Sequence, residues 1–146
     1  MTLIFSRECE HAIQAVTYLA RLPGESRTSI PQLARTLKIP HSFLAKILQR
    51  LTQKGLLTST KGPRGGFALG MPAKEITLFH VVDAVDGVGF TNRCVLGFPE
   101  CSGKHPCAVH EQWSGVRDTI YSLLVSRDLS EIGAAMRKPE YEAVKP

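Results

Sequence analysis

The sequence has no long apolar run. Nowhere in its 146 residues does an uninterrupted apolar stretch approach the about 18 residues that a membrane-spanning helix needs. The apolar run near the N-terminus, residues 3–5, is too short for the hydrophobic region of a secretory signal peptide. We therefore expect a cytoplasmic protein with no membrane partner, whose cysteines stay reduced.

The motifs of common catalytic sites are also missing. The sequence has no C-x2-C dithiol, no phosphate-binding loop and no Ser/His/Asp arrangement, which predicts that the protein is not an enzyme. Its content of 43% hydrophobic and 21% charged residues is ordinary for a globular protein. At 146 residues the chain is long enough for one domain with an appended element, but not for two large cores.

Charge is unevenly distributed along the chain. Residues 1–70 carry 10 Lys and Arg but only 3 Asp and Glu, whereas the remainder carries 8 and 10. Chance is one explanation of this asymmetry. The other is a polyanion-binding module followed by a second functional element, for which a basic half joined to a slightly acidic half is typical.

Apolar spacing in the basic half predicts three helices. The first covers residues 9–21 and is ended by Pro23-Gly24. The second begins at Ser29, which can cap it. The third opens at Ser42 and stops near Lys54.

A hairpin is predicted directly after these helices. Two strand-like runs, residues 56–60 and 66–69, flank a tip at residues 61–65 that is rich in Gly and Pro. Helix, helix-turn-helix and hairpin in this order define a winged helix-turn-helix. We assign it to residues 1–72, and the fold class is mainly α with a small β-hairpin wing.

The second half is predicted to contain two more helices and a loop. A helix over residues 76–86 leads into an irregular loop over 88–107 and then a long helix from about 108 to 127. We group residues 73–130 as one unit and expect the tail, 131–146, to be frayed.

Apolar residues of the long helix recur with the 3.5-residue period of a coiled-coil seam. This pattern favours a homodimer whose subunits meet along the helix, and the alternative is a helix that packs on its own core. The seam consists of Val109, Trp113, Val116, Ile120 and Leu123.

The third helix presents a polar stripe that could read duplex DNA. Ser42, Lys46 and Gln49 lie at positions i, i+4 and i+7, so one face could reach base edges in the major groove. Arg50 is predicted to contact phosphates. The alternative is a solvated helix face with no ligand.

The predicted wing carries two cations at its tip. Lys61 and Arg64 could enter a minor groove, where the narrow width concentrates negative potential. Gly62, Gly65 and Gly66 are expected to adopt positive φ in the turn.

Three cysteines and a histidine form a candidate metal site. Cys94, Cys101 and Cys107 lie within one loop, and His110 follows three residues after the last of them. Thiolates select zinc, Cu(I) or iron–sulfur clusters. The x6 and x5 spacings lack the knuckle usual for structural zinc, so an iron–sulfur cluster is favoured, with zinc or a bare thiol redox switch as alternatives. Cys9 is expected to be a buried apolar residue of the first helix.

The segment Gly55 to Gly70, together with Ser42-Phe-Leu-Ala-Lys-Ile-Leu48, resembles the family of the iron–sulfur cluster regulator IscR and the nitric-oxide-sensing repressor NsrR. The resemblance extends to about residue 130 and implies a homodimer joined by the long helix, with Ser42, Lys46 and Lys61 as DNA contacts. It implies a dimeric transcription regulator, favoured as a repressor, that senses redox, iron–sulfur or nitric oxide status. Ala45 departs from the iron–sulfur regulator, which has a carboxylate there, so operator sequence cannot be carried over.

The same resemblance implies a fourth, non-cysteine ligand. In the cluster regulator this is a His that matches His110, which favours a 2Fe–2S centre. In the nitric oxide sensor it is a carboxylate that matches Glu10, supplied across the dimer, which goes with a 4Fe–4S centre. The first cysteine spacing is one residue longer than the family pattern. The alternative function is a zinc-bound or thiol-switched winged helix that serves as a protein-interaction module.

Overall fold

The computed structural model describes residues 4–24 and 26–142. The first half of the chain contains α1 (Arg7–Arg21), α2 (Ile30–Leu37), α3 (His41–Gln53), β1 (Leu57–Thr60) and β2 (Gly66–Leu69). The second half contains the 3-10 turn η1 (Ala73–Glu75), α4 (Leu78–Val85), the 3-10 turn η2 (Gly89–Thr91), α5 (His110–Val125), α6 (Leu129–Ala135) and α7 (Pro139–Glu142). The predicted fold class, mainly α with a two-stranded antiparallel wing, is confirmed.

The first helices begin at residues that can cap them. The Ser6 hydroxyl accepts a hydrogen bond from the Cys9 N–H at 3.0 Å, so α1 starts two residues before the predicted boundary. The Ser29 hydroxyl accepts from the Gln32 N–H at 3.3 Å, as the predicted cap of α2 requires. Because α3 begins at His41, Ser42 lies inside its first turn rather than before it.

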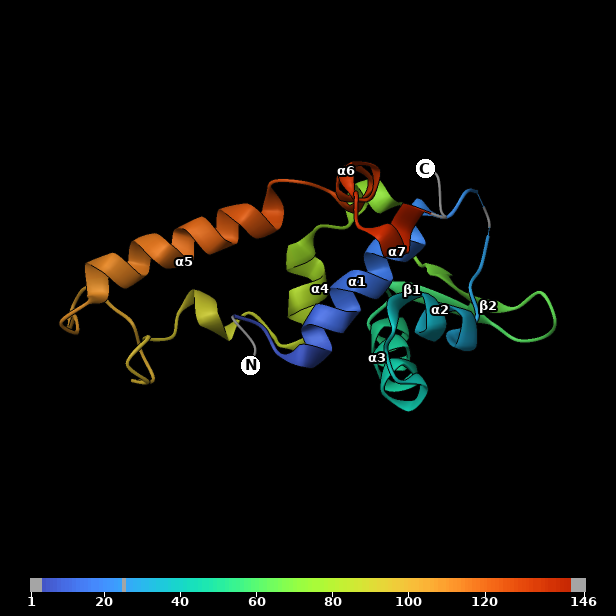
Figure 1. Cartoon of the computed structure of the whole chain (residues 1–146). Helices are drawn as coiled ribbons and strands as arrows, with labels where there is room; N and C mark the ends of the chain where they lie inside the picture. Colours follow the sequence, from blue (N-terminus) through green and yellow to red (C-terminus); the bar gives the residue numbers. More distant parts are fainter. Residues whose placement is uncertain (1–3, 25, 143–146) are drawn as a thin grey trace.

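α1 is the central helix of the body and packs against α3, α4 and α6 (Figure 1). The core forms because leucines and β-branched residues of several elements bury their side chains together, which is the main favourable contribution to folding. Its largest fully buried side chains include Val16, Leu33, Leu44, Ile47, Leu48, Leu51, Leu57, Ile76, Val81 and Leu129. The helix-turn-helix and the start of α6 therefore share one core.

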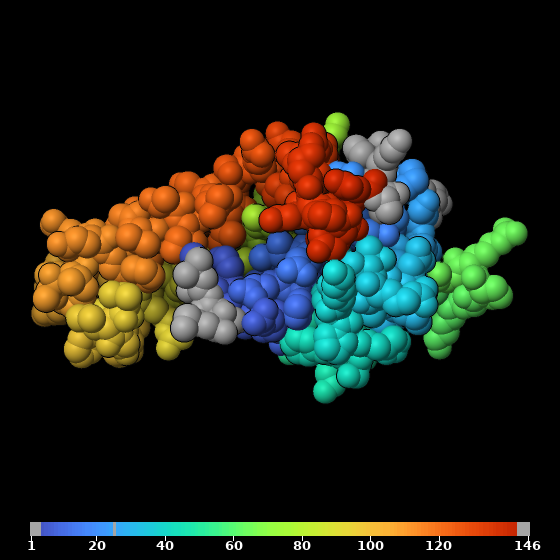
Figure 2. Space-filling view, in the orientation of Figure 1, coloured from blue at the N-terminus to red at the C-terminus, as the bar shows by residue number. Residues whose placement is uncertain are grey.

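The hairpin is held to the helices by a third extended segment. β1 pairs with β2 from Leu57 opposite Leu69 to Thr60 opposite Gly66. Thr28, just before α2, bridges to Phe67 through two backbone hydrogen bonds of 3.0 and 2.8 Å. The wing therefore has a fixed base on the helix-turn-helix, while its tip projects from the body (Figure 2).

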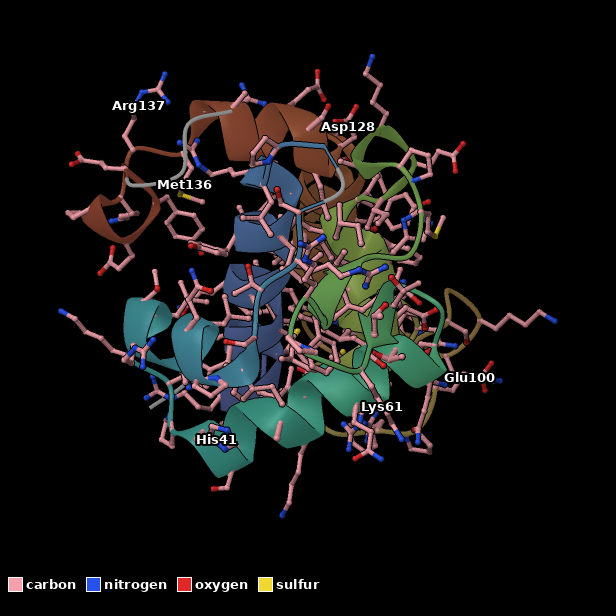
Figure 3. The ribbon with its side chains drawn as sticks, turned by 90° about the vertical axis from the view of Figure 1, so that its right-hand side faces the viewer. His41, Lys61, Glu100, Asp128, Met136 and Arg137 are labelled. Carbon is pink, nitrogen blue, oxygen red and sulfur yellow. The ribbon has the colours of Figure 1, made fainter. Side chains whose placement is uncertain are left out.

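The prediction of a frayed tail is wrong for residues 131–142, and residues 143–146 lie outside the described part of the chain. Asp128 caps α6 by accepting from the Glu131 N–H at 3.0 Å, and the Leu129 N–H donates to the Ile76 carbonyl at 2.8 Å. Tyr141 is buried, and its hydroxyl donates to the Gln14 carbonyl at 2.8 Å. α6 covers the side of α1 opposite α3, as Figure 3 shows from Asp128 above to His41 below. The tail was mispredicted because its apolar residues become interpretable only once α1 supplies a surface.

Replacing Leu129 with alanine is expected to lower the free energy of unfolding by about 2–5 kcal/mol, because a fully buried leucine leaves a cavity when it is truncated. Urea denaturation of the variant and the parent protein measures this loss. The matched control is Leu96→Ala, which truncates a leucine that is 55% exposed and should leave the midpoint nearly unchanged. Equal midpoints for both variants would mean that α6 does not dock on α1.

α5 projects from the body as an arm (Figures 1 and 2). Towards its C-terminal end Leu124 is buried against Val82 and Cys9, and Ile120 packs against the same cluster. Of the predicted seam, Val116 is 48% exposed and Leu123 is 62% exposed. Val109, Trp113 and Ile120 are half-buried. The subunit therefore covers the seam only in part and leaves Val116 and Leu123 exposed.

No helix in the described residues combines the length and the apolar character that crossing a membrane would need.

Candidate functional site

The outer face of α3 is open to solvent. Ser42, Lys46 and Gln49 are all exposed, whereas Leu44, Ile47, Leu48 and Leu51 on the opposite face are buried. Phe43 is half-buried, and its ring packs against the His11 ring in a T-shaped arrangement with a centroid distance of 5.5 Å. The polar stripe is therefore available to a ligand, and its contact with DNA stays a prediction.

Arg50 has partners within the protein. One guanidinium nitrogen lies 3.1 Å from the Glu8 carboxylate and 3.5 Å from the Val85 carbonyl at the end of α4. The sequence pattern missed both partners because Glu8 and Val85 are distant in sequence. An Arg50 contact with phosphate would have to compete with this ion pair, so Arg50 differs from Lys46, for which the described residues show no ion pair.

Lys61 and Arg64 are exposed at the tip of the wing. Gly62 and Gly66 have φ of 103° and 136°, as predicted for turn residues. The expectation of positive φ is wrong for Gly65. Glycine is required there for space: a Cβ on Gly65 would lie 2.0 Å from the Thr60 carbonyl oxygen.

A groove of about 390 Å³ lies between α3 and the wing. Its lining includes the polar side chains of Gln49, Thr52, Gln53 and Ser59. At the wing base, an Arg27 guanidinium nitrogen lies 3.4 Å from the Thr58 hydroxyl and 3.5 Å from the Gly66 carbonyl. Sequence reasoning singled out neither Gln53 nor Arg27, because neither belongs to the stripe or the wing tip.

The predicted metal ligands lie together. Cys94, Cys101, Cys107 and His110 all line one pocket of about 280 Å³ between η2 and the start of α5. The sulfurs of Cys94 and Cys107 are 3.6 Å apart, and the Cys101 sulfur is 3.2 Å from Nδ1 of His110. The four donors therefore form two close pairs.

Backbone groups hold the cysteine loop in place around the pocket. The Leu96 N–H donates to the Cys94 sulfur at 3.4 Å, and this bond is the main reason that the pKa of Cys94 lies below its ordinary value. The Cys101 N–H donates to the Asn92 carbonyl at 3.2 Å. The indole N–H of Trp113 on α5 donates to the Arg93 carbonyl at 2.8 Å, which ties the start of the loop to the helix that follows it.

The donor chemistry fits a soft metal centre, but the donors do not surround a single point. In the part of the chain that the structure describes, no group of three or more His, Cys, Asp or Glu side chains is placed as the ligands of one metal ion. Three thiols and an imidazole are nevertheless donors that iron–sulfur clusters and zinc accept. Any metal assigned to this pocket must therefore be compatible with two separate pairs of donors, Cys94 with Cys107 and Cys101 with His110.

The remaining candidate ligands differ in position. Glu10 lies on α1, 3.7 Å from an Arg7 guanidinium nitrogen, and does not line the pocket in its own subunit. His105 does line it. Cys9 is fully buried, as predicted, and burial raises its pKa to about 12.

A helix-turn-helix with an exposed third helix beside a basic hairpin wing defines the class of winged-helix DNA-binding proteins. Residues 5–135 match the Rrf2 family, described as an iron-dependent transcriptional regulator, and the chain belongs to this family.

Curated relatives are transcriptional regulators and not enzymes. The chain is similar to the HTH-type transcriptional regulator IscR of Photorhabdus laumondii, with 32% identity over 122 residues that cover 84% of this chain and 74% of the relative. It is 30% identical over 132 residues to a protein of Aquifex aeolicus that is provisionally assigned as an HTH-type transcriptional regulator, covering 89% and 91% of the two chains.

Solved structures show the same fold. CymR, the global cysteine regulator of B. subtilis, superposes with a TM-score of 0.80 at 24% identity, covering 93% of this chain and 100% of that one. T. potens IscR superposes with a TM-score of 0.71 at 22% identity, covering 94% and 95%. At these identities the likeness supports the winged-helix architecture and says nothing about a ligand.

Proposed function

We propose that the chain is a homodimeric, operator-binding transcription regulator, acting as a repressor, whose occupancy of DNA depends on an iron–sulfur cluster held by Cys94, Cys101, Cys107 and His110. The observation that carries the proposal is the convergence of these four residues on one pocket directly before α5. The exposed face of α3 and the cations of the wing supply the DNA-binding surface.

The arrangement of the donors in pairs supports a 2Fe–2S centre, in which each iron takes two protein ligands. Two thiolates on one tetrahedral metal with bonds of about 2.3 Å lie about 3.8 Å apart, and a thiolate and an imidazole about 3.6 Å apart. The observed separations are 3.6 Å for Cys94 and Cys107 and 3.2 Å for Cys101 and His110. A mononuclear zinc site needs all four donors around one point, which the described residues do not offer.

A 4Fe–4S centre with Glu10 as its fourth ligand is the second candidate. It needs Glu10 from the partner subunit, because the Glu10 carboxylate does not reach the pocket of its own chain. Direct entry of His110 into the pocket favours the first candidate.

The exposed apolar face of α5 supports a homodimer. Val116 and Leu123 belong to a 3.5-residue repeat, and both stay exposed on the projecting helix. A second copy of the same helix supplies the matching surface of a coiled-coil-like contact.

Pocket and arm are mechanically connected. Cys107 lies three residues before α5, and Trp113 on α5 holds the Arg93 carbonyl beside Cys94. A shift of either cysteine is therefore passed to the helix that sets the distance between the two subunits. The two half-sites of an operator lie about 34 Å apart. A small rotation of the α5 helices would therefore move the α3 helix of one subunit out of line with its half-site. A bound cluster would supply chemistry that oxidants, nitric oxide or iron loss can alter.

The proposal is tested by anaerobic reconstitution with iron and sulfide. We expect about two irons and two sulfides per chain, together with an absorbance spectrum of the 2Fe–2S type. Affinity for an operator fragment selected from random duplexes should differ between the loaded and cluster-free protein. Zinc alone in the purified protein, or identical affinities, would contradict cluster-dependent regulation, and a monomer in sedimentation would contradict the dimer.

Glu8→Gln is expected to raise affinity for duplex DNA about two- to fivefold, the range of a surface ion pair, because Arg50 then has no carboxylate partner to leave. Fluorescence anisotropy with the cluster-free protein and a mixed-sequence duplex measures the change. Glu10→Gln is the matched control, since it removes the same charge two residues further along α1, where the carboxylate pairs with Arg7 and not with Arg50. An equal gain in both variants would reduce the effect to net charge and rule out competition at Arg50.

A further inference from the structure

Two thiols of the pocket lie close enough to react with each other. The sulfurs of Cys94 and Cys107 are 3.6 Å apart. A disulfide bond is about 2.05 Å long, so the sulfurs need to approach by only about 1.6 Å. Such a bond would join the first residues of the cysteine loop to its end, immediately before α5.

The loop between the two cysteines can absorb this movement. Residues 92–109, all within the described chain, contain no helix or strand. Gly97 has φ of 89°, and a Cβ added at Gly103 would meet nothing within 4 Å. Cys94 is buried, but Val95 and Leu96 after it are more than half exposed, so the segment that follows Cys94 can move without displacing packed side chains.

The other two thiols are engaged or hidden. The Cys101 sulfur lies 3.2 Å from Nδ1 of His110, on the other pair of the pocket. Cys9 is fully buried in α1, where it packs with Val82 and Leu124. Cys101 therefore has His110 as its close partner, and Cys9 does not line the pocket.

We infer that, when the pocket holds no cluster, Cys94 and Cys107 form an intramolecular disulfide with a peroxide as the oxidant. Hydrogen peroxide transfers one oxygen to the half-buried Cys107 thiol, giving a sulfenic acid and one water. The Cys94 sulfur then attacks the Cys107 sulfur, the S–S bond forms, and the sulfenic oxygen leaves as a second water with both protons accounted for. Two thiols are oxidised, and one peroxide is reduced to two waters.

The disulfide has a consequence for metal loading. It removes two of the four donors, one whole pair, so the oxidised chain cannot accept a cluster until a dithiol reduces it. This consequence rests on the proposed function, whereas the disulfide itself rests only on the placement of the two sulfurs. A cluster lost under reducing conditions therefore leaves a pocket that can be reloaded at once. A cluster lost under peroxide leaves a pocket that needs reduction first.

Peptide mapping of the peroxide-treated, cluster-free full chain tests the disulfide. Cleavage after Glu100 and Lys104 places Cys94, Cys101 and Cys107 on three separate peptides. We expect the peptides of Cys94 and Cys107 to be linked within one chain, in the parent protein and equally in Cys101→Ser and Cys9→Ser. Cys94→Ser and Cys107→Ser should each lose the link. A link to Cys101, a link between two chains, or free thiols throughout would overturn the inference.

Iron loading of the same samples tests the consequence. Reduced protein is expected to bind iron and sulfide, and oxidised protein at least about tenfold less, with full recovery after dithiothreitol. Equal loading of both forms would overturn the claim that the disulfide prevents cluster binding. If the mapped link forms but the reduced chain binds no cluster either, the disulfide stands and the proposed function fails.

Discussion

Cys107→Ala is expected to abolish stable cluster binding, lowering the affinity of the pocket for iron about 100-fold or more. Loss of an outer partner of a metal ligand already costs about 10- to 100-fold, and Cys107 would be a direct ligand. The Cys107 sulfur lies 3.6 Å from the Cys94 sulfur, and Cys107 is the last cysteine before α5. Iron and sulfide per chain after anaerobic reconstitution and desalting give the readout.

The matched control is Cys9→Ala. It also removes one thiol, but from the buried face of α1 and not from the pocket, so loading should stay at the level of the parent protein. His110→Ala and Glu10→Gln separate the two candidate fourth ligands: a 2Fe–2S centre loses stability with the first, a 4Fe–4S centre with the second. Full loading of Cys107→Ala would remove the cysteine pocket as the cluster site.

Local patterns were sufficient to predict most of the winged helix. The Ser29 cap and the extent of α3 depend on neighbours within a few residues; the structure confirms the cap and places the ends of α3 within one residue of the prediction. Gly65 was misjudged because its constraint is the approach of the Thr60 carbonyl, which depends on the register of the hairpin. The sequence shows that a glycine stands at this position, but not whether it is needed for its φ angle or for the space that the facing strand leaves.

The order of the tail and the ion pair of Arg50 were missed for one physical reason. α6 depends on a backbone hydrogen bond from Leu129 to Ile76, and Arg50 depends on Glu8, so both contacts join segments far apart in sequence. Periodicity reports which face is apolar or polar and not what meets that face. The cysteine loop shows the same limit: spacing predicted the set of donors, and only the fold arranges them in pairs.

Replacing both wing cations, Lys61→Ala with Arg64→Ala, is expected to lower the affinity for duplex DNA about sixtyfold per wing at about 0.1 M salt. Each cation that neutralises a phosphate releases counterions worth about 0.9 in the slope of log K against log salt, or about eightfold in affinity at that salt concentration. Both side chains are exposed at the wing tip. Anisotropy titrations across a salt series, with a mixed-sequence duplex of about 30 base pairs, measure the affinity and its slope.

The matched control is Arg137→Ala with Lys138→Ala, which removes one exposed arginine and one exposed lysine; Figure 3 shows Arg137 on the side of the molecule opposite α3. The slope of log K against log salt for this control should equal that of the parent protein, because those cations lie away from α3 and the wing. The reduction of this slope in the wing variant also shows how many wings of the dimer contact DNA. A slope reduced by about 1.8 means one engaged wing, and about 3.6 means two, as a homodimer on two half-sites requires. An unchanged slope would place the wing outside the DNA interface and leave α3 alone to hold the duplex.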